Sequence, residues 1–262
     1  MITAPFVVVG AGPSGLGCAW ELAQQGAVVV VDRIPVAGGS AGWSSPTVRR
    51  LVERVASRGV RLRLGETAMR FDGTTLTVAT PSGFHHIEGK QLIVAAGLRP
   101  ATAANLGIDG DRPAGVLAAT VAEHLLHTGV RLWQTVVILG DGPWSQPVAT
   151  MCRRLGTRVI GIAERASWAD ERIDPVPRLS VIGRDRITGV RLRHSTRDVT
   201  VNCDALVLSG DPRPNRNVVG ALGAGDGNVV FHQPIRPTNT QDRFQAGATA
   251  MRDWLHSSGG TS

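Results

Sequence analysis

Residues 7–32 read VVVGAGPSGLGCAWELAQQGAVVVVD, and this stretch decides the fold. An apolar run typical of a buried strand ends at Gly10, a helical pattern follows the glycines, and a second apolar run ends in Asp32. This order of strand, glycine turn, helix, strand and acid is that of a dinucleotide-binding βαβ unit. The stretch therefore predicts an α/β fold with a parallel sheet and a nucleotide at the glycine turn.

Each residue type in this turn has a physical task. The first glycine permits the tight turn, the second lets the backbone approach a pyrophosphate, and the third lets the helix pack close to the strand. The N-terminus of the helix offers unpaired N–H groups and a positive dipole to the phosphates, and the Asp32 carboxylate can accept hydrogen bonds from a ribose. The predicted phosphate-binding residues are Gly10, Gly12, Pro13, Ser14 and Gly15.

A second copy of the unit follows in residues 136–156, VVILGDGPWSQPVATMCRRLG. It carries defects: Ser145 replaces the third glycine and places a side chain where the helix should press on the strand, and Pro147 risks a kink. The strand after the helix leads to Glu164, an acid that would favour NAD over NADP. We expect Gly140, Gly142, Ser145 and Glu164 to form an NAD site if the copy still binds its ligand, and the sequence leaves that open. Gly10, Gly12, Ala19 and Gly26 of the first copy correspond to Gly140, Gly142, Ala149 and Gly156 of the second.

Composition and charge exclude several classes of protein. The net charge is +7, but the arginines are scattered and no aromatic residues lie among them, so nucleic acid is not an expected ligand. No apolar stretch approaches the length of a membrane span, and the N-terminus shows no signal-peptide pattern. We expect a cytoplasmic protein without contact to a membrane.

The reactive side chains form no recognisable catalytic set. Three isolated cysteines exclude a CxxC dithiol and an iron–sulfur cluster held by this chain alone, and no metal-binding cluster or catalytic triad stands out. The catalytic residues stay unknown. His232 could approach a cofactor, but a surface position is the favoured interpretation, and core packing is favoured for Trp43.

Three further motifs are Asp32-Arg33 followed by Gly38-Gly39, Ala95-Ala96-Gly97-Leu98-Arg99-Pro100, and Asn202 to Gly210 followed by Pro214-Asn215. Together with the two units, they resemble those of flavoproteins with two dinucleotide-binding domains, the group that contains thioredoxin reductase-like and glutathione reductase-like enzymes. The resemblance covers nearly the whole chain, and it implies FAD in the first unit and NAD(P)H in the second. It also implies Rossmann-like domains: an FAD-binding domain of residues 1–113 plus 230–262 and an NAD(P)-binding-like domain of residues 114–229. Short strands with turns between them follow each unit and predict a small β-meander in each domain. From these motifs the resemblance adds Arg33, Gly39, Ala96 and Gly97 to the FAD site, and it adds Ala68 as well.

The chain lacks the redox cysteine pair of the disulfide-reducing members. It looks most like the flavin subunits of heteromeric amine and amino-acid dehydrogenases, such as sarcosine oxidase α, hydrogen cyanide synthase and opine oxidase. That resemblance implies an amine or amino-acid substrate, a second flavoprotein as partner and, in some complexes, a separate iron–sulfur protein. Two alternatives stay open: a stand-alone NAD(P)H-dependent flavoprotein reductase, and a non-catalytic scaffold that keeps the fold.

The C-terminal segment departs from the family pattern. Ala246-Gly247 resembles the Ala-Gly-Asp turn that closes on FAD, which places Gly247 in the cofactor site, but Ala248 stands where the Asp belongs. In an alternative alignment, residues 242–256 form the final helix and the Asp turn is deleted. Under either alignment the FAD site is trimmed on one side, and we expect a partner subunit to cover the exposed region.

Overall fold

The structure is a computed structural model that divides into two compact units, Met1–Leu98 with Pro214–Ser262, and Arg99–Arg213. The structure places the boundaries between the units at 98/99 and 213/214, and the expected boundaries at 113/114 and 229/230 lie further along the chain. Residues 99–113 group with the second unit because Ile108 pairs there with Leu179. The chain crosses between the units at the short strands β7 (Leu98–Arg99) and β17 (Arg213–Pro214). The structure describes residues 2–193, 197–215, 227–232 and 239–258.

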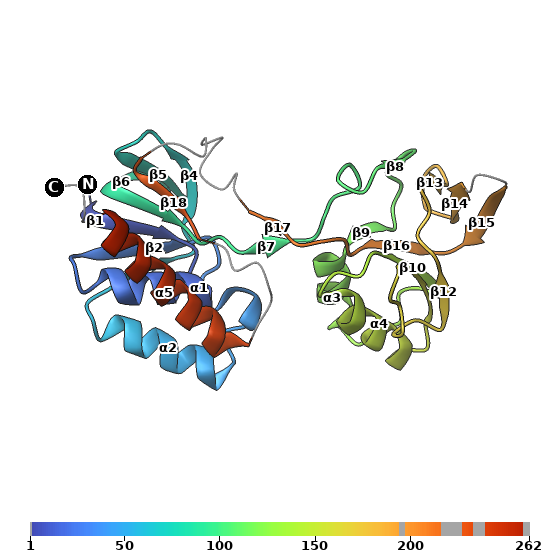
Figure 1. The fold of residues 1–262 in the computed structure, drawn as a ribbon, viewed down its shortest axis with the longest axis horizontal. Coiled ribbons are helices and arrows are strands. Elements are labelled where there is room, and N and C mark those ends of the chain that lie inside the picture. The colour runs from blue at the N-terminus through green and yellow to red at the C-terminus, as the bar shows by residue number, and fades with distance from the viewer. Residues whose placement is uncertain (1, 194–196, 216–226, 233–238, 259–262) are drawn as a thin grey trace. The chain divides into compact units, whose positions relative to one another are not determined.

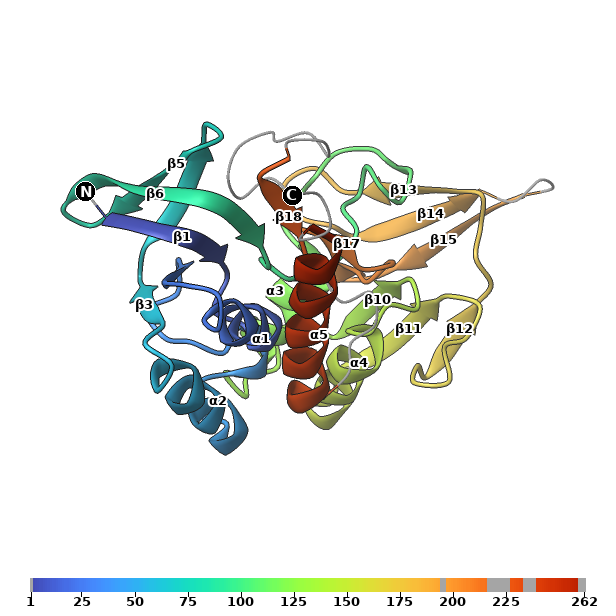
Figure 2. The same cartoon turned by 60° about the vertical axis from the view of Figure 1, so that its left-hand side comes forward.

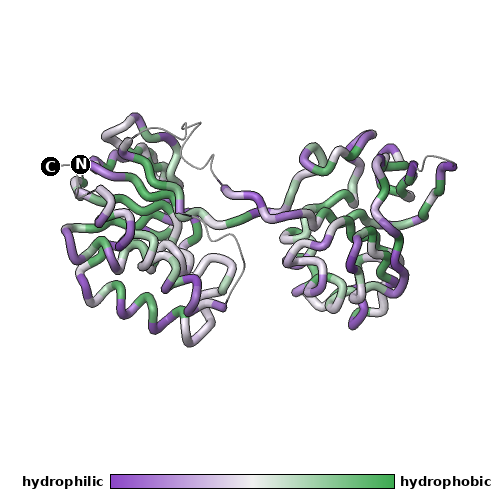
Figure 3. The backbone as a smooth tube through the Cα atoms, viewed as in Figure 1, coloured by the Kyte–Doolittle hydropathy of each residue, from purple (hydrophilic) through white to green (hydrophobic). Residues whose placement is uncertain are grey.

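The first unit is built on a seven-stranded sheet with the order β3-β2-β1-β6-β5-β4, to which β18 adds by pairing with β6. Its central strands are valine-rich and buried on both faces, as expected of parallel strands covered on both sides. Figure 3 shows hydrophobic residues, in green, along these strands. The strands are β1 (Ile2–Val9), β2 (Val28–Asp32), β3 (Arg61–Leu64), β4 (Thr67–Phe71), β5 (Thr75–Thr80), β6 (Gly83–Val94) and β18 (Val229–Phe231). The helices are α1 (Pro13–Leu22), the 3-10 turn η1 (Gly39–Ala41), α2 (Pro46–Ala56) and α5 (Thr240–Ser258).

The parallel register brings the carboxyl ends of the central strands to one edge. Val9 at the end of β1 pairs with Val31 of β2 on one side and with Val94 at the end of β6 on the other. The chain runs from β1 to β2 and β3 in one direction and places β6 in the other, so β1 and β6 form a topological switch point. Ligands of doubly wound folds bind outside such a point, at the carboxyl ends of the strands.

Helices α1, α2 and α5 cover one face of this sheet (Figure 1). The backbones of α1 and α5 approach so closely that a Cβ on Gly17 would collide with the carbonyl oxygen of Phe244. At the same crossing, the Glu21 carboxylate, nearly buried, accepts two hydrogen bonds of 3.0 Å from the Arg252 guanidinium. Small residues and one ion pair therefore fix α5 against the helix that follows the glycine turn.

The second unit repeats the plan with a parallel sheet of order β12-β11-β10-β16-β9 and a second sheet of order β15-β14-β13-β8. Helices α3 and α4 pack on one face of the parallel sheet, and the β13–β15 meander packs on the other (Figure 2). The strands are β8 (Ile108–Asp109), β9 (Val116–Ala118), β10 (Thr135–Leu139), β11 (Arg158–Ile162), β12 (Glu171–Ile173), β13 (Arg178–Ile182), β14 (Gly189–Arg193), β15 (Asp198–Asn202) and β16 (Ala205–Leu208). The helices are α3 (Ala119–Leu126) and α4 (Ser145–Arg154).

The predicted fold class, two Rossmann-like α/β units that each carry a small β-meander, is thus confirmed. In the described part of the chain, no helix has the length and apolar character that crossing a membrane requires.

Candidate functional site

The turn after β1 is held between the two neighbouring strands. Gly10 donates its N–H to the Val31 carbonyl oxygen at 2.8 Å, and Ala95 donates its N–H to the Val9 carbonyl oxygen at 2.9 Å. Gly10 has φ +112°, and a Cβ there would collide with the Ala95 carbonyl oxygen. Glycine is therefore required both by the backbone angle and by the space.

The next two glycines shape the start of α1. Gly12 is the N-cap residue, with Pro13 as the first helical residue, and a Cβ on Gly12 would meet no atom within 4 Å. A Cβ on Gly15 would collide with the Gly10 carbonyl oxygen, so the helix begins in close contact with the turn. The first N–H groups of a helix have no partner within the helix, and here they lie beside open space above Gly12. This cradle fits a pyrophosphate. Ser14 lies in the same first turn and is largely buried.

Asp32 connects the end of β2 to the glycine turn. Its carboxylate accepts the Ala11 N–H at 2.6 Å and the Ile34 N–H at 2.9 Å. A carboxylate has about four acceptor positions, so two stay available for ribose hydroxyls. Arg33, the next residue, is exposed. The sequence predicted the ribose contact; the bond that orders the turn itself was not predicted.

The segment after β2 folds back on the same turn. Gly38 donates its N–H to the Ala11 carbonyl oxygen at 2.9 Å, and a Cβ on Gly39 would lie 3.2 Å from the Cα of Gly12. Gly39 thus lies against the predicted phosphate loop. Trp43, in the same segment, is 59% exposed, so the prediction of core packing is wrong.

Ala68, Ala96 and Gly97 have different surroundings. Ala68 is buried in the core cluster that contains strand β2, so only its backbone could reach a cofactor. Ala96 and Gly97 follow β6 at the carboxyl edge, where Asn215 bonds both: its side-chain amide donates to the Ala96 carbonyl oxygen at 3.2 Å and its N–H to that of Gly97 at 3.0 Å. Asn215 therefore fixes this part of the edge, a role that the sequence did not indicate.

His232 extends the same edge beyond β18. Its N–H donates to the Val94 carbonyl oxygen at 2.9 Å, which places it beside the end of β6. Its Nε2 is buried and has no hydrogen-bond partner among the described residues. Burial lowers the pKa of the imidazole because it penalises the charged form. His232 is therefore half-buried, because the pairing of β18 with β6 draws it toward the sheet.

Gly247 does not form a turn at the cofactor site. It lies inside the uninterrupted helix α5, where a Cβ would collide with the Ser14 carbonyl oxygen. The alignment of Ala246-Gly247 with the Ala-Gly-Asp turn is therefore wrong, and the alternative with a final helix agrees with the structure. Gly247 serves the close packing of α5 on α1. Part of the segment before α5, residues 233–238, lies outside the described residues.

The second glycine turn differs from the first in its surroundings. Gly140 repeats the positive φ, at +100°, but Gly142 donates its N–H to the Ser209 carbonyl oxygen at 2.7 Å. Ser145 is buried and begins α4. Glu164 is exposed and lies two residues beyond Ile162, the residue that ends β11 as Asp32 ends β2. The expected acid is therefore not at the strand end.

The cysteines are buried and lie apart in three core clusters. Cys18 belongs to the first unit, while Cys152 and Cys203 lie on opposite faces of the second unit's parallel sheet. Burial raises the pKa of Cys18 and raises the pKa of Cys152 and of Cys203 to about 12. Since the thiolate is the reactive form, none of these thiols is built for redox chemistry.

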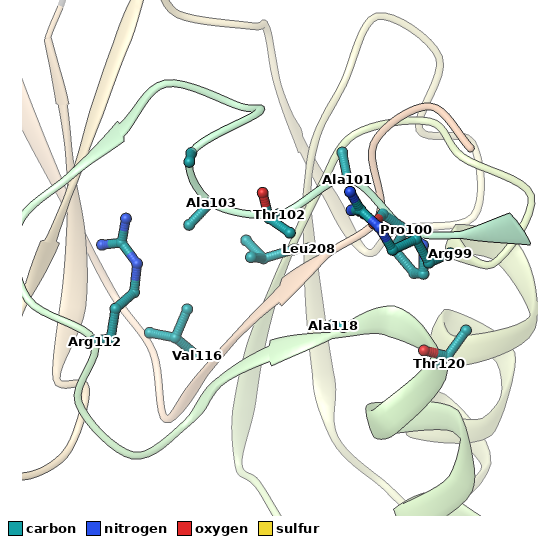
Figure 4. Close-up of a pocket in the computed structure, with 11 residues that line it drawn as sticks. Arg99, Pro100, Ala101, Thr102, Ala103, Arg112, Val116, Ala118, Thr120 and Leu208 are labelled. Atoms are coloured by element: carbon teal, nitrogen blue, oxygen red, sulfur yellow. The ribbon is translucent and has the colours of Figure 1, made fainter. Parts of the chain in front are cut away.

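A hollow of about 460 Å³ in the second unit was not expected from the sequence (Figure 4). Arg99 and Arg112 stand at its opposite ends, and Val116 and Leu208 lie between them. The Arg112 guanidinium is engaged with loop carbonyl oxygens, among them that of Gly110 at 2.7 Å. Its side chain therefore organises the loop that borders the hollow.

Comparison with known proteins agrees with this geometry. The family model described as pyridine nucleotide-disulphide oxidoreductase matches residues 5–208. The chain belongs to this family. Its members are FAD-dependent oxidoreductases, and interaction with NAD(P) is typical of them.

Among curated proteins, the chain is 28% identical over 182 residues to one of the opine oxidase subunits of Rhizobium meliloti (strain 1021), covering 62% of this chain and 38% of that protein. The chain thus spans well under half of this relative's length. Among solved structures, it resembles L-proline dehydrogenase from P. horikoshii with a TM-score of 0.67 and 16% identity, covering 98% of this chain and 56% of that one. Thioredoxin reductase from T. acidophilum gives a TM-score of 0.64 with 15% identity, covering 98% and 99%. At these identities the solved structures support the fold alone.

Proposed function

We propose that the chain is an FAD-dependent oxidoreductase that holds its FAD in the first unit. The observation that carries this proposal is the open cradle at Gly12, enclosed by the bonded turn at Gly10 and by the Asp32 carboxylate. When bound, FAD supplies the chemistry of hydride acceptance and release. The protein's residues would bind the pyrophosphate at the start of α1, bind the ribose at Asp32, and place the flavin along the edge formed by Ala96, Gly97 and His232.

The chain acts, in this proposal, as the flavin subunit of a complex that oxidises an amine or amino acid. The three buried, separated thiols speak against a disulfide substrate. The similarity to an opine oxidase subunit supports a partner protein. That partner is a second flavoprotein, with a separate iron–sulfur protein as a further component, and a cytoplasmic location fits this assembly.

The test uses the tagged chain purified from its native host together with whatever subunits it holds. The complex and the isolated chain are each mixed anaerobically with proline or an opine, and flavin absorbance is followed. We expect the flavin to bleach in the complex and to stay oxidised in the isolated chain. Bleaching of the isolated chain by NADH alone would contradict this proposal and favour the stand-alone reductase.

A further inference from the structure

The second glycine turn is closed by the strand end that it faces. A Cβ on Gly142 would lie 2.5 Å from the Ser209 carbonyl oxygen and 2.6 Å from that of Gly210, whereas a Cβ on Gly12 would meet nothing within 4 Å. The Gly142 N–H is already bonded to Ser209 at 2.7 Å. The space that a pyrophosphate needs, and one N–H that would bind it, are therefore both taken up within the protein.

Two buried serines hold this closed arrangement. The Ser145 hydroxyl donates to the Gly140 carbonyl oxygen at 2.9 Å and is hydrogen-bonded to the Ser209 hydroxyl at 2.8 Å. Ser145 is 1% exposed and Ser209 is fully buried. Both hydroxyls have hydrogen-bond partners inside the protein. The pair therefore stabilises the closed turn, and neither hydroxyl needs a ligand as its partner.

Helix α4 also begins late. The first helical residue of α1 is Pro13, while the corresponding Pro143 lies in a turn and α4 begins at Ser145. This start places Pro147 in the first turn of the helix, where its missing N–H costs nothing and the expected kink does not arise. The positive end of the helix is consequently withdrawn by two residues, about 3 Å, from the position that faces the phosphates in the first unit.

The charges at the second turn are unfavourable to a dinucleotide as well. Asp141 stands between the two glycines, where the first unit has Ala11, and its carboxylate is partly exposed. Its ion pair with Arg165 spans 4.0 Å, and the Arg165 side chain is 91% exposed, so solvent screens the pair. The hollow beside the loop is lined by Asp141, Trp168 and Arg154 among others, so a carboxylate lies next to its N–H donors.

We infer that the second unit of this chain binds no pyridine dinucleotide. Nicotinamide therefore does not reach the FAD through this unit, although that route is typical of the family. The inference stands on the second unit's own contacts and holds whether or not the proposed amine-oxidising complex exists.

Equilibrium dialysis of the FAD-saturated chain against NAD and NADP tests this directly. We expect no saturable binding of either dinucleotide. Saturable binding, accompanied by slower hydrogen exchange in a peptide that covers residues 140–147, would overturn the inference. Failure of the proposed function would show separately, as an absence of bound FAD or of substrate-dependent bleaching.

Hydrogen exchange also tests whether the serine pair closes the turn. Ser145→Ala removes the hydroxyl that bonds Gly140 and Ser209, and Thr150→Ala removes an exposed hydroxyl of the same helix that bonds the Gln146 carbonyl oxygen. We expect the Gly142 amide to exchange about tenfold faster in the Ser145 variant, the factor that one ordinary hydrogen bond corresponds to. Equal exchange in the two variants would show that the serine pair does not close the turn.

Discussion

The Asp32 carboxylate accepts the Ala11 N–H at 2.6 Å, so the acid expected to bind a ribose also orders the turn expected to bind the phosphates. The two parts of the cofactor site are therefore coupled through a single side chain. A change at Asp32 should affect both the ribose contact and the shape of the turn.

For Asp32→Asn we expect FAD affinity to fall about 10- to 100-fold, because a hydrogen bond to a charged group contributes about 1.5–3 kcal/mol. Fluorescence titration of the apoprotein with FAD measures the change. Asp72→Asn is the matched control, since Asp72 also accepts backbone N–H groups, but in the turn between β4 and β5. Equal affinity in the two variants would remove Asp32 from the site.

The crossing of α1 and α5 predicts a sensitive position at Gly17. A methyl group there meets the Phe244 carbonyl oxygen, so Gly17→Ala should destabilise the protein by about 1–3 kcal/mol, the cost of overpacking. Urea denaturation followed by circular dichroism measures this. Gly227→Ala, whose Cβ meets nothing within 4 Å, should change the free energy of unfolding little, and a similar effect of both changes would count against the close crossing.

The thiols should be inert in the folded protein. Burial raises the pKa of Cys152 and of Cys203 to about 12, and Cys18 is raised as well, so thiolate is scarce at pH 8. We expect an aromatic disulfide reagent to label none of the cysteines at that pH until urea unfolds the chain. Rapid labelling of native protein would mean that a thiol is available for redox chemistry.

His232 should make stability depend on pH. Burial lowers the pKa of its imidazole below the usual 6.5, so the unfolded chain binds the proton more readily than the folded one. Above pH 6.5 the imidazole is neutral, so its burial penalises no charge. The folded protein loses stability as the pH falls from 6.5 through the lowered pKa. His232→Gln should flatten this part of the curve of unfolding free energy against pH. An unchanged slope in the variant would show that another group causes the dependence.

Sequence patterns predicted the first unit well because its requirements are local. Gly10 needs a positive φ and Gly15 a close helix, and both needs appear as glycines at fixed spacing. The β-meanders were likewise predicted from short strands with turns between them. The correspondence of Gly140 with Gly10 predicted that the second turn repeats the first, and Gly140 does repeat the positive φ of Gly10.

Contacts between distant segments were harder to predict. The sequence predicted that the Ser145 side chain would disturb the packing of the helix on the strand. The structure accommodates it because α4 begins late and Ser209, 64 residues away in the sequence, is its hydrogen-bond partner. Gly247 was predicted to lie in a turn at the cofactor. The prediction failed because Ala-Gly is a short pattern that also suits a close crossing of two helices. His232 depends on the pairing of β18 with β6, which the sequence did not specify.

The most direct test of the central claim is the FAD content of the purified chain and of Gly12→Val. A Cβ at Gly12 meets no atom within 4 Å, and the residue has φ −71°, so the variant should fold with the melting temperature of the wild-type protein stripped of FAD. The added side chain fills the space assigned to the pyrophosphate. Chromatography of the cofactor released by heat should give one FAD per wild-type chain and almost none for the variant. A folded Gly12→Val protein with a full complement of FAD would contradict the assignment of this turn as the FAD site.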